Sequence, residues 1–128
     1  MNEAAVAAQI EKIHKTETDP LFYNNEQSLR SVIKLAFFAY KDKYTQLEEL
    51  PSGNGYADVV YLPKHSSKYP ILIIELKCND TADGAIKQIL ERDYPDKLKD
   101  RGEEILLVGI SYNKNDPDKH HSCKIEKI

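Results

Sequence analysis

Two acids and a lysine stand inside two of the most apolar segments of this chain. Asp58 interrupts the segment 55–63, and Glu75 and Lys77 lie near the end of the segment 69–79. Placing an ion in a dry protein interior costs on the order of several kcal/mol. These charges therefore belong either to strand ends that emerge into solvent with an incidental ion pair, or to a site that uses charge.

The spacing of the two segments brings the acids together. Both are rich in β-branched and aromatic residues, which is typical of strands, and the polar linker 64–68 is short enough for an antiparallel hairpin. The start of one strand then lies beside the end of the next, so Asp58 and Glu75 are expected to be neighbours, with Cβ atoms about 5 Å apart if they share a face. Two such carboxylates repel each other unless a proton or a cation lies between them. A hard divalent ion such as Mg²⁺ resolves that repulsion.

The same residues carry a resemblance to a known family. Sixteen residues separate Asp58 from Glu75-Leu76-Lys77, a pattern that resembles the D…E-x-K signature of the PD-(D/E)XK nuclease superfamily. The segments Gly-Tyr-Ala-Asp-Val-Val, Ile-Ile-Glu-Leu-Lys and Ala-Ile-Lys-Gln-Ile…Tyr resemble one group of it in particular, often found at the carboxyl end of larger proteins behind an AAA-type ATPase-like domain. The likeness covers roughly residues 23–113. One departure is Tyr56, where many relatives carry an arginine before the catalytic aspartate.

The resemblance implies a fold, an activity and a site. The fold would be restriction-endonuclease-like, and the activity would be hydrolysis of phosphodiester bonds in nucleic acid, with DNA favoured over RNA, dependent on Mg²⁺ or Mn²⁺. Asp58 and Glu75 would hold the metal with the backbone carbonyl of Leu76. Lys77, which alternation places on the face of Glu75, would position the attacking water or stabilise the charged transition state.

Three further residues become candidates through the resemblance, and each has a simpler explanation. Glu26, in the first turn of a predicted helix, is a candidate third carboxylate for the metal, although the helix dipole alone explains an acid there. Gln88 and Tyr94 are candidate contacts to the substrate. Gln88 borders the apolar stripe of its helix, where glutamines are usually only solvated.

The surrounding elements predict an α/β fold with a mixed central sheet flanked by helices, in the order α-α-β-β-β-α-β-β. The segment 104–112 is apolar on both faces and is expected to be a central strand parallel to a neighbour. The segments 43–50 and 123–128 are expected at the edges of the sheet. The predicted core comprises Leu29, Ile33, Phe37, Val59, Ile73, Ile74, Ile86, Ile89, Leu107 and Val108.

The predicted helices carry more specific expectations. Asn24, with Gln27 three residues on, resembles a capping box at the start of the second helix. In the third helix the buried stripe is expected to include Leu90. The first helix has a narrow apolar stripe, so it packs on something upstream or covers a sheet edge. Residues 1–20 are interpreted as a helix and linker that precede a nuclease-like domain at 21–128.

Length, composition and net charge argue against several classes of function. The 128 residues suit one domain, and the net charge of −3 argues against a strongly basic nucleic-acid binder. The sequence has no apolar run of membrane-spanning length and no signal-peptide pattern, and its two cysteines favour a reducing cytoplasm. The crowded segment His120-His121-Ser122-Cys123 cannot form a tetrahedral zinc site alone and is expected to be a loop and strand start.

Two functions from different classes therefore remain open. The first is a metal-dependent nuclease, which Asp58, Glu75 and Lys77 favour. The second is a non-catalytic module that keeps the nuclease fold and serves as a regulatory or interaction part of a larger ATPase-like protein. The acidic balance and Tyr56 favour the second, and under that reading an upstream ATPase-like domain or partner is expected.

Overall fold

The structure, a computed structural model, describes residues 2–18, 23–48, 56–64, 69–91 and 98–128. The order of elements agrees with the predicted α-α-β-β-β-α-β-β. The elements are α1 (Glu3–Glu17), α2 (Glu26–Ala36), the short 3₁₀ helix η2 (Phe38–Tyr40), β1 (Tyr44–Glu48), β2 (Tyr56–Pro63), β3 (Ile71–Cys78), α3 (Ala82–Leu90), β4 (Ile105–Tyr112) and β5 (His121–Lys127).

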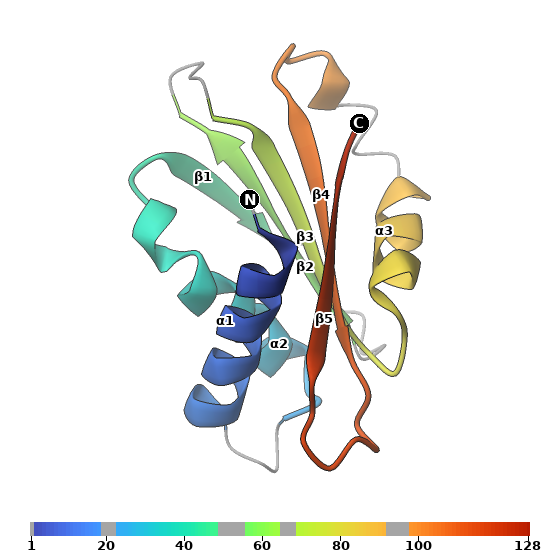
Figure 1. The fold of residues 1–128 in the computed structure, drawn as a ribbon. Helices are drawn as coiled ribbons and strands as arrows, with labels where there is room; N and C mark the ends of the chain where they lie inside the picture. Colours follow the sequence, from blue (N-terminus) through green and yellow to red (C-terminus); the bar gives the residue numbers. More distant parts are fainter. Residues whose placement is uncertain (1, 19–22, 49–55, 65–68, 92–97) are drawn as a thin grey trace.

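One mixed five-stranded sheet, in the order β1-β2-β3-β4-β5, forms the centre of the molecule (Figure 1). Strand β2 is antiparallel to both of its neighbours, β1 and β3, and β5 is antiparallel to β4. Strands β3 and β4 are parallel, so the chain must cross over between them, and α3 lies in that crossover. The predicted parallel pair and the two predicted edge strands are confirmed.

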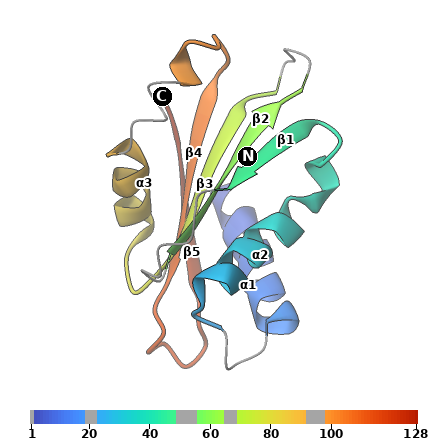
Figure 2. The same ribbon diagram turned by 180° about the vertical axis from the view of Figure 1, so that it is seen from behind.

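Helices cover both faces of the sheet, with α1 and α2 on one face and α3 on the other (Figures 1 and 2). The strands supply side chains alternately to two apolar clusters. Leu72 and Ile74 pack with Leu29 and Ile33 of α2, whereas Ile71 and Ile73 pack with Ile86 of α3. All ten residues of the predicted core are buried.

The structure corrects two predictions about the helices, the cap of α2 and the burial of Leu90, and it decides between the two expectations for α1. The side chain of Asn25, not Asn24, caps α2 by accepting hydrogen bonds from the amides of Gln27 and Ser28. Leu90 is 49% exposed, because α3 ends there and the residue points away from the sheet. Helix α1 contacts β5 and α2, and its Ile10 is fully buried among the residues of the α2 face. Of the two expectations for α1, packing against an edge of the sheet is the one observed.

None of the described helices is both long and apolar enough to cross a membrane.

Candidate active site

Asp58 and Glu75 lie directly opposite each other on β2 and β3. Opposed residues of an antiparallel pair point to the same face, here the face of Val60 and Ile73, which α3 covers. Both side chains are buried: Asp58 is 2% exposed and Glu75 is not exposed at all. The predicted pairing of Asp58 with Glu75 across the two strands is confirmed.

The donor set suits a hard divalent cation. Two buried carboxylates on one face repel each other strongly, and oxygen ligands are those that Mg²⁺ and Mn²⁺ prefer. Asp58 and Glu75 are the side chains that would hold the ion. The side chain of Leu76 packs in the cluster on the opposite face, so only its backbone is able to face the same site.

Lys77 lies at the end of β3, where the sheet meets solvent. Its ammonium contacts a carboxylate oxygen of Asp80 at 2.8 Å and donates a hydrogen bond to the side-chain carbonyl of Gln88 on α3. The hydrogen bond from Lys77 lowers the pKa of the Asp80 carboxyl, and a second bond from the amide of Thr81 lowers it further. Gln88 therefore contacts Lys77, while its predicted contact with substrate stays a prediction. Asp80 is a residue that the sequence analysis did not single out.

A surface hollow of about 360 Å³ opens beside Lys77. It is lined by Lys77, Asp80, Gly84, Lys87, Gln88 and Glu91. Two glycines, Gly84 and Gly109, allow neighbouring parts of the chain to pack closely beside this hollow. A Cβ atom on Gly84 would lie 2.3 Å from an oxygen of Asp80, and one on Gly109 would lie 2.5 Å from the backbone oxygen of Ala82. Gly109 is the neighbour of Glu75 on β4, so its missing side chain lets the start of α3 approach the sheet beside that carboxylate.

Arg30 of α2 is a charged residue at the site that the sequence analysis missed. It is 3% exposed, and its Nη2 atom lies 4.0 Å from Oδ1 of Asp58. The available signal was its spacing, since Arg30 lies three residues before the buried Ile33 and so within the apolar stripe of the helix. No rule of spacing shows which acid on a different element such an arginine meets.

Two candidates remain without a described side chain. Glu26 is the first residue of α2, one turn before Arg30, and its side chain is outside the part of the chain that the structure describes. Tyr94 lies in the segment 92–97, which is also outside the described residues. The roles predicted for both stay predictions.

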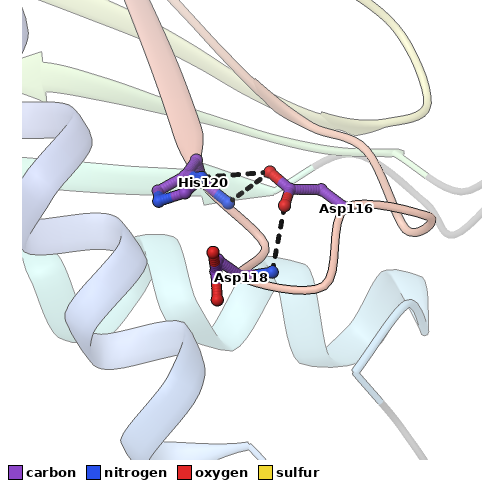
Figure 3. Close-up of side chains that lie close together, drawn as sticks. All are labelled: Asp116, Asp118 and His120. Atoms are coloured by element: carbon purple, nitrogen blue, oxygen red, sulfur yellow. Dashed lines mark hydrogen bonds and ion pairs between the residues drawn. The ribbon is translucent and has the colours of Figure 1, made fainter.

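A separate group of potential ligands lies in the loop between β4 and β5. One ligand atom from each of Asp116, Asp118 and His120 lies within 4.8 Å of the others (Figure 3). Asp116 accepts hydrogen bonds from the amides of Asp118 and His120, and its Oδ2 lies 3.2 Å from Nδ1 of His120. These bonds account for the shape of the loop, and we assign no metal to it.

The neighbouring His121 belongs to a buried aromatic group. His14 of α1 is fully buried, its Nδ1 lies 2.9 Å from Nε2 of His121, and its ring stacks on Tyr23 with 3.5 Å between centroids. The ring of His121 in turn stacks on Tyr112 of β4. As predicted, His120 ends a loop and His121 begins strand β5.

Comparison with known proteins agrees with this geometry. The sequence model of the PD-(D/E)XK nuclease superfamily matches residues 24–121. The comparison with curated proteins found no match. The matched segment contains α2, all strands up to the start of β5, the opposed carboxylates and Lys77, so the chain belongs to the PD-(D/E)XK nuclease superfamily.

Proposed function

We propose that this nuclease-like domain hydrolyses phosphodiester bonds of nucleic acid, DNA in preference to RNA, with Mg²⁺ or Mn²⁺ as cofactor. The observation that carries the proposal is the register of β2 and β3, which sets Asp58 opposite Glu75 and leaves Lys77 two residues further along the same face. Family membership supports nucleic acid as the partner class.

Each residue has a role that follows from its chemistry. Asp58 and Glu75 would hold the divalent ion, which would supply a water molecule of lowered pKa and positive charge beside the phosphate. Lys77 directs its ammonium at a non-bridging phosphate oxygen, where negative charge increases as water attacks phosphorus and the bond to the leaving oxygen breaks. Asp80 and Gln88 orient that ammonium before the substrate arrives, so little reorganisation is needed during the reaction.

The test pairs metal binding with cleavage. Asp58→Asn and Glu75→Gln remove one negative charge each with little change of shape. We expect both variants to lose Mn²⁺ binding in isothermal titration calorimetry and to lose cleavage of labelled DNA and RNA together. Asp83→Asn is the matched control, because Asp83 is an exposed acid of α3 whose partner is Lys124. Cleavage that survives in Asp58→Asn or Glu75→Gln would contradict the proposal.

The net charge of −3 favours a second candidate, a non-catalytic regulatory or interaction module of a larger ATPase-like protein. Such a module needs no divalent ion. If the parent protein binds neither Mg²⁺ nor Mn²⁺ and Glu75→Gln changes nothing measurable, this second function replaces the first. Binding of a divalent ion that depends on Glu75, together with cleavage, excludes it.

A further inference from the structure

Arg30 occupies an unusual place for a charged residue. It lies on α2 next to Leu29 and three residues before Ile33, both fully buried, and it is itself 3% exposed. Lys34, one turn further along the same helix, is half-exposed and pairs with Glu48 at 2.7 Å, as surface lysines commonly do. A buried guanidinium is costly unless a nearby negative charge compensates it.

Arg30 contacts an acid of the candidate active site. Its Nη2 lies 4.0 Å from Oδ1 of Asp58, which is 2% exposed. This is ion-pair contact, and it is longer than a direct N–H···O hydrogen bond between the same two atoms. Helix α2 covers the face of the sheet opposite to α3, whereas strand alternation places Asp58 on the α3 face with Val60. Arg30 therefore brings a positive charge from the α2 layer to a carboxylate of the other face.

We propose that Arg30 is a positioning residue that neutralises Asp58 opposite Glu75 and competes with the divalent cation for that carboxylate. The proposal rests on the proposed function, since it concerns the same metal site. In the metal-free protein the guanidinium offsets part of the repulsion between the two carboxylates. When the cation binds, its charge and that of Arg30 repel each other, so Arg30 weakens cation binding while it stabilises the metal-free fold.

A purely structural role for Arg30 predicts a different pattern. If the arginine only filled space in the α2 layer, its replacement would lower stability to the same extent with and without metal. The affinity for the cation would then stay the same or fall, because the site would be less well ordered. If Arg30 competes with the cation, its replacement should instead raise the affinity for the cation. The direction of the change in affinity therefore distinguishes competition from a purely structural role.

The first test is a titration with Mn²⁺ alone, followed by calorimetry, which needs no cleavage. Arg30→Met keeps the length of the side chain and removes the charge, and we expect it to bind Mn²⁺ about tenfold or more tightly than the parent. Arg30→Lys keeps the charge and is expected to bind as the parent does. Lys34→Met removes a positive charge from the surface of the same helix and is expected to leave the affinity unchanged.

The second test is a stability cycle without metal, in which thermal unfolding of Arg30→Met, Asp58→Asn and the double variant is compared. Each single variant removes one member of a buried ion pair and is expected to lower the unfolding temperature, whereas the double variant recovers part of the loss. A double variant that folds where Arg30→Met does not would also support the pairing. Strictly additive losses, or a double variant that fails to fold, would overturn it.

The outcomes distinguish this inference from the proposed function. If the parent binds Mn²⁺ and cleaves nucleic acid but Arg30→Met binds the ion no more tightly, the competition is wrong and the function stands. If Arg30→Lys binds as tightly as Arg30→Met, charge is not the cause and the inference fails. A parent that binds no divalent ion refutes the proposed function and the competition, and the stability cycle then decides the pairing of Arg30 with Asp58.

Discussion

At the scale of single residues, Lys77 differs from the two carboxylates in its exposure to solvent. Asp58 and Glu75 are buried, whereas the side chain of Lys77 is 15% exposed and reaches the open hollow beside α3. Under the proposed function, a substrate phosphate that enters from solvent would meet the ammonium before it meets the carboxylates. Lys77 would then contribute to the reaction without being needed to bind the metal.

Lys77→Ala should separate these two contributions. We expect the variant to bind Mn²⁺ as the parent does, because neither carboxylate is altered, and to cleave nucleic acid about 10²-fold more slowly, as loss of one electrostatic stabiliser does elsewhere. The measurements are calorimetric titration and initial rates on one labelled DNA. Lys34→Ala is the control for removal of a lysine. A variant that cleaves as fast as the parent would remove Lys77 from the mechanism.

The sequence predicts some site residues and not others for a physical reason. Asp58, Glu75 and Lys77 lie on a hairpin, where residue spacing fixes which side chains are opposed, so local geometry was sufficient. Arg30 and Asp80 reach the site through contacts between a helix and the sheet or across a turn. Such contacts depend on how elements pack, which no periodicity within one element determines.

At the scale of elements, Gly109 controls how closely α3 approaches the sheet. Its Cα is registered with that of Glu75, and a Cβ atom there would lie 2.5 Å from the backbone oxygen of Ala82 and 3.0 Å from the side chain of Ile86. Backbone cannot move aside as a flexible side chain can. The position of α3, and with it that of Gln88, depends on this one residue having no side chain.

Gly109→Ala should therefore displace α3. We expect the free energy of unfolding in urea to fall by about 1–3 kcal/mol, the usual cost of overpacking, and cleavage to slow because Gln88 moves relative to Lys77. Ser122→Ala on β5 is an exposed control that should stay within about 0.5 kcal/mol of the parent. Equal stability of Gly109→Ala and the parent would show that α3 tolerates the shift.

The elements themselves were largely predictable, and their ends were not. Apolar periodicity and β-branched runs determine which segments become helices and strands, and the two-sided apolar run at β4 indicated a central parallel strand. Asn24 and Asn25 are chemically equivalent as caps, so the sequence does not show which of them begins α2. The backbone geometry of the folded chain selects Asn25. Leu90 is exposed because the helix ends before its stripe completes another turn.

At the scale of the whole molecule, the buried histidines join parts that are far apart in sequence. His14 belongs to α1 and His121 begins β5, and Nε2 of His14 lies 2.7 Å from the backbone oxygen of Tyr23 near the start of α2. Glu11 accepts a hydrogen bond from the amide of His121, and Lys15 pairs with Glu11. This group attaches α1 to the end of the sheet at which the candidate site lies.

The histidine pair predicts how stability depends on pH. Burial lowers the pKa of His14 to about 4 from its ordinary 6.5 and also lowers the pKa of His121. The unfolded chain takes up these protons near pH 6.5 and the folded protein only at lower pH, so stability is lost as pH falls from about 6.5 to about 4. We expect the free energy of unfolding to be lower at pH 5 than at pH 7 by on the order of 1–2 kcal/mol.

Two variants check that this loss belongs to the buried pair. His14→Phe keeps an aromatic ring beside Tyr23 and removes the titrating group, so the difference in unfolding free energy between pH 7 and pH 5 should shrink. His120→Gln removes an exposed histidine and should keep the difference of the parent. The same difference in His14→Phe as in the parent would assign the pH dependence to other groups.

The antiparallel pair β2–β3, which carries Asp58 and Glu75, also bears on the order in which the strands pair during folding. Pairing β2 with β3 closes a short stretch of chain, whereas pairing β3 with β4 must wait for the longer crossover through α3. Short closures are faster than long ones. We therefore expect the two acids to meet during refolding before α3 covers their face, while water still screens their repulsion. The dry surroundings of the acids are completed only when the chain has returned through α3 and β4.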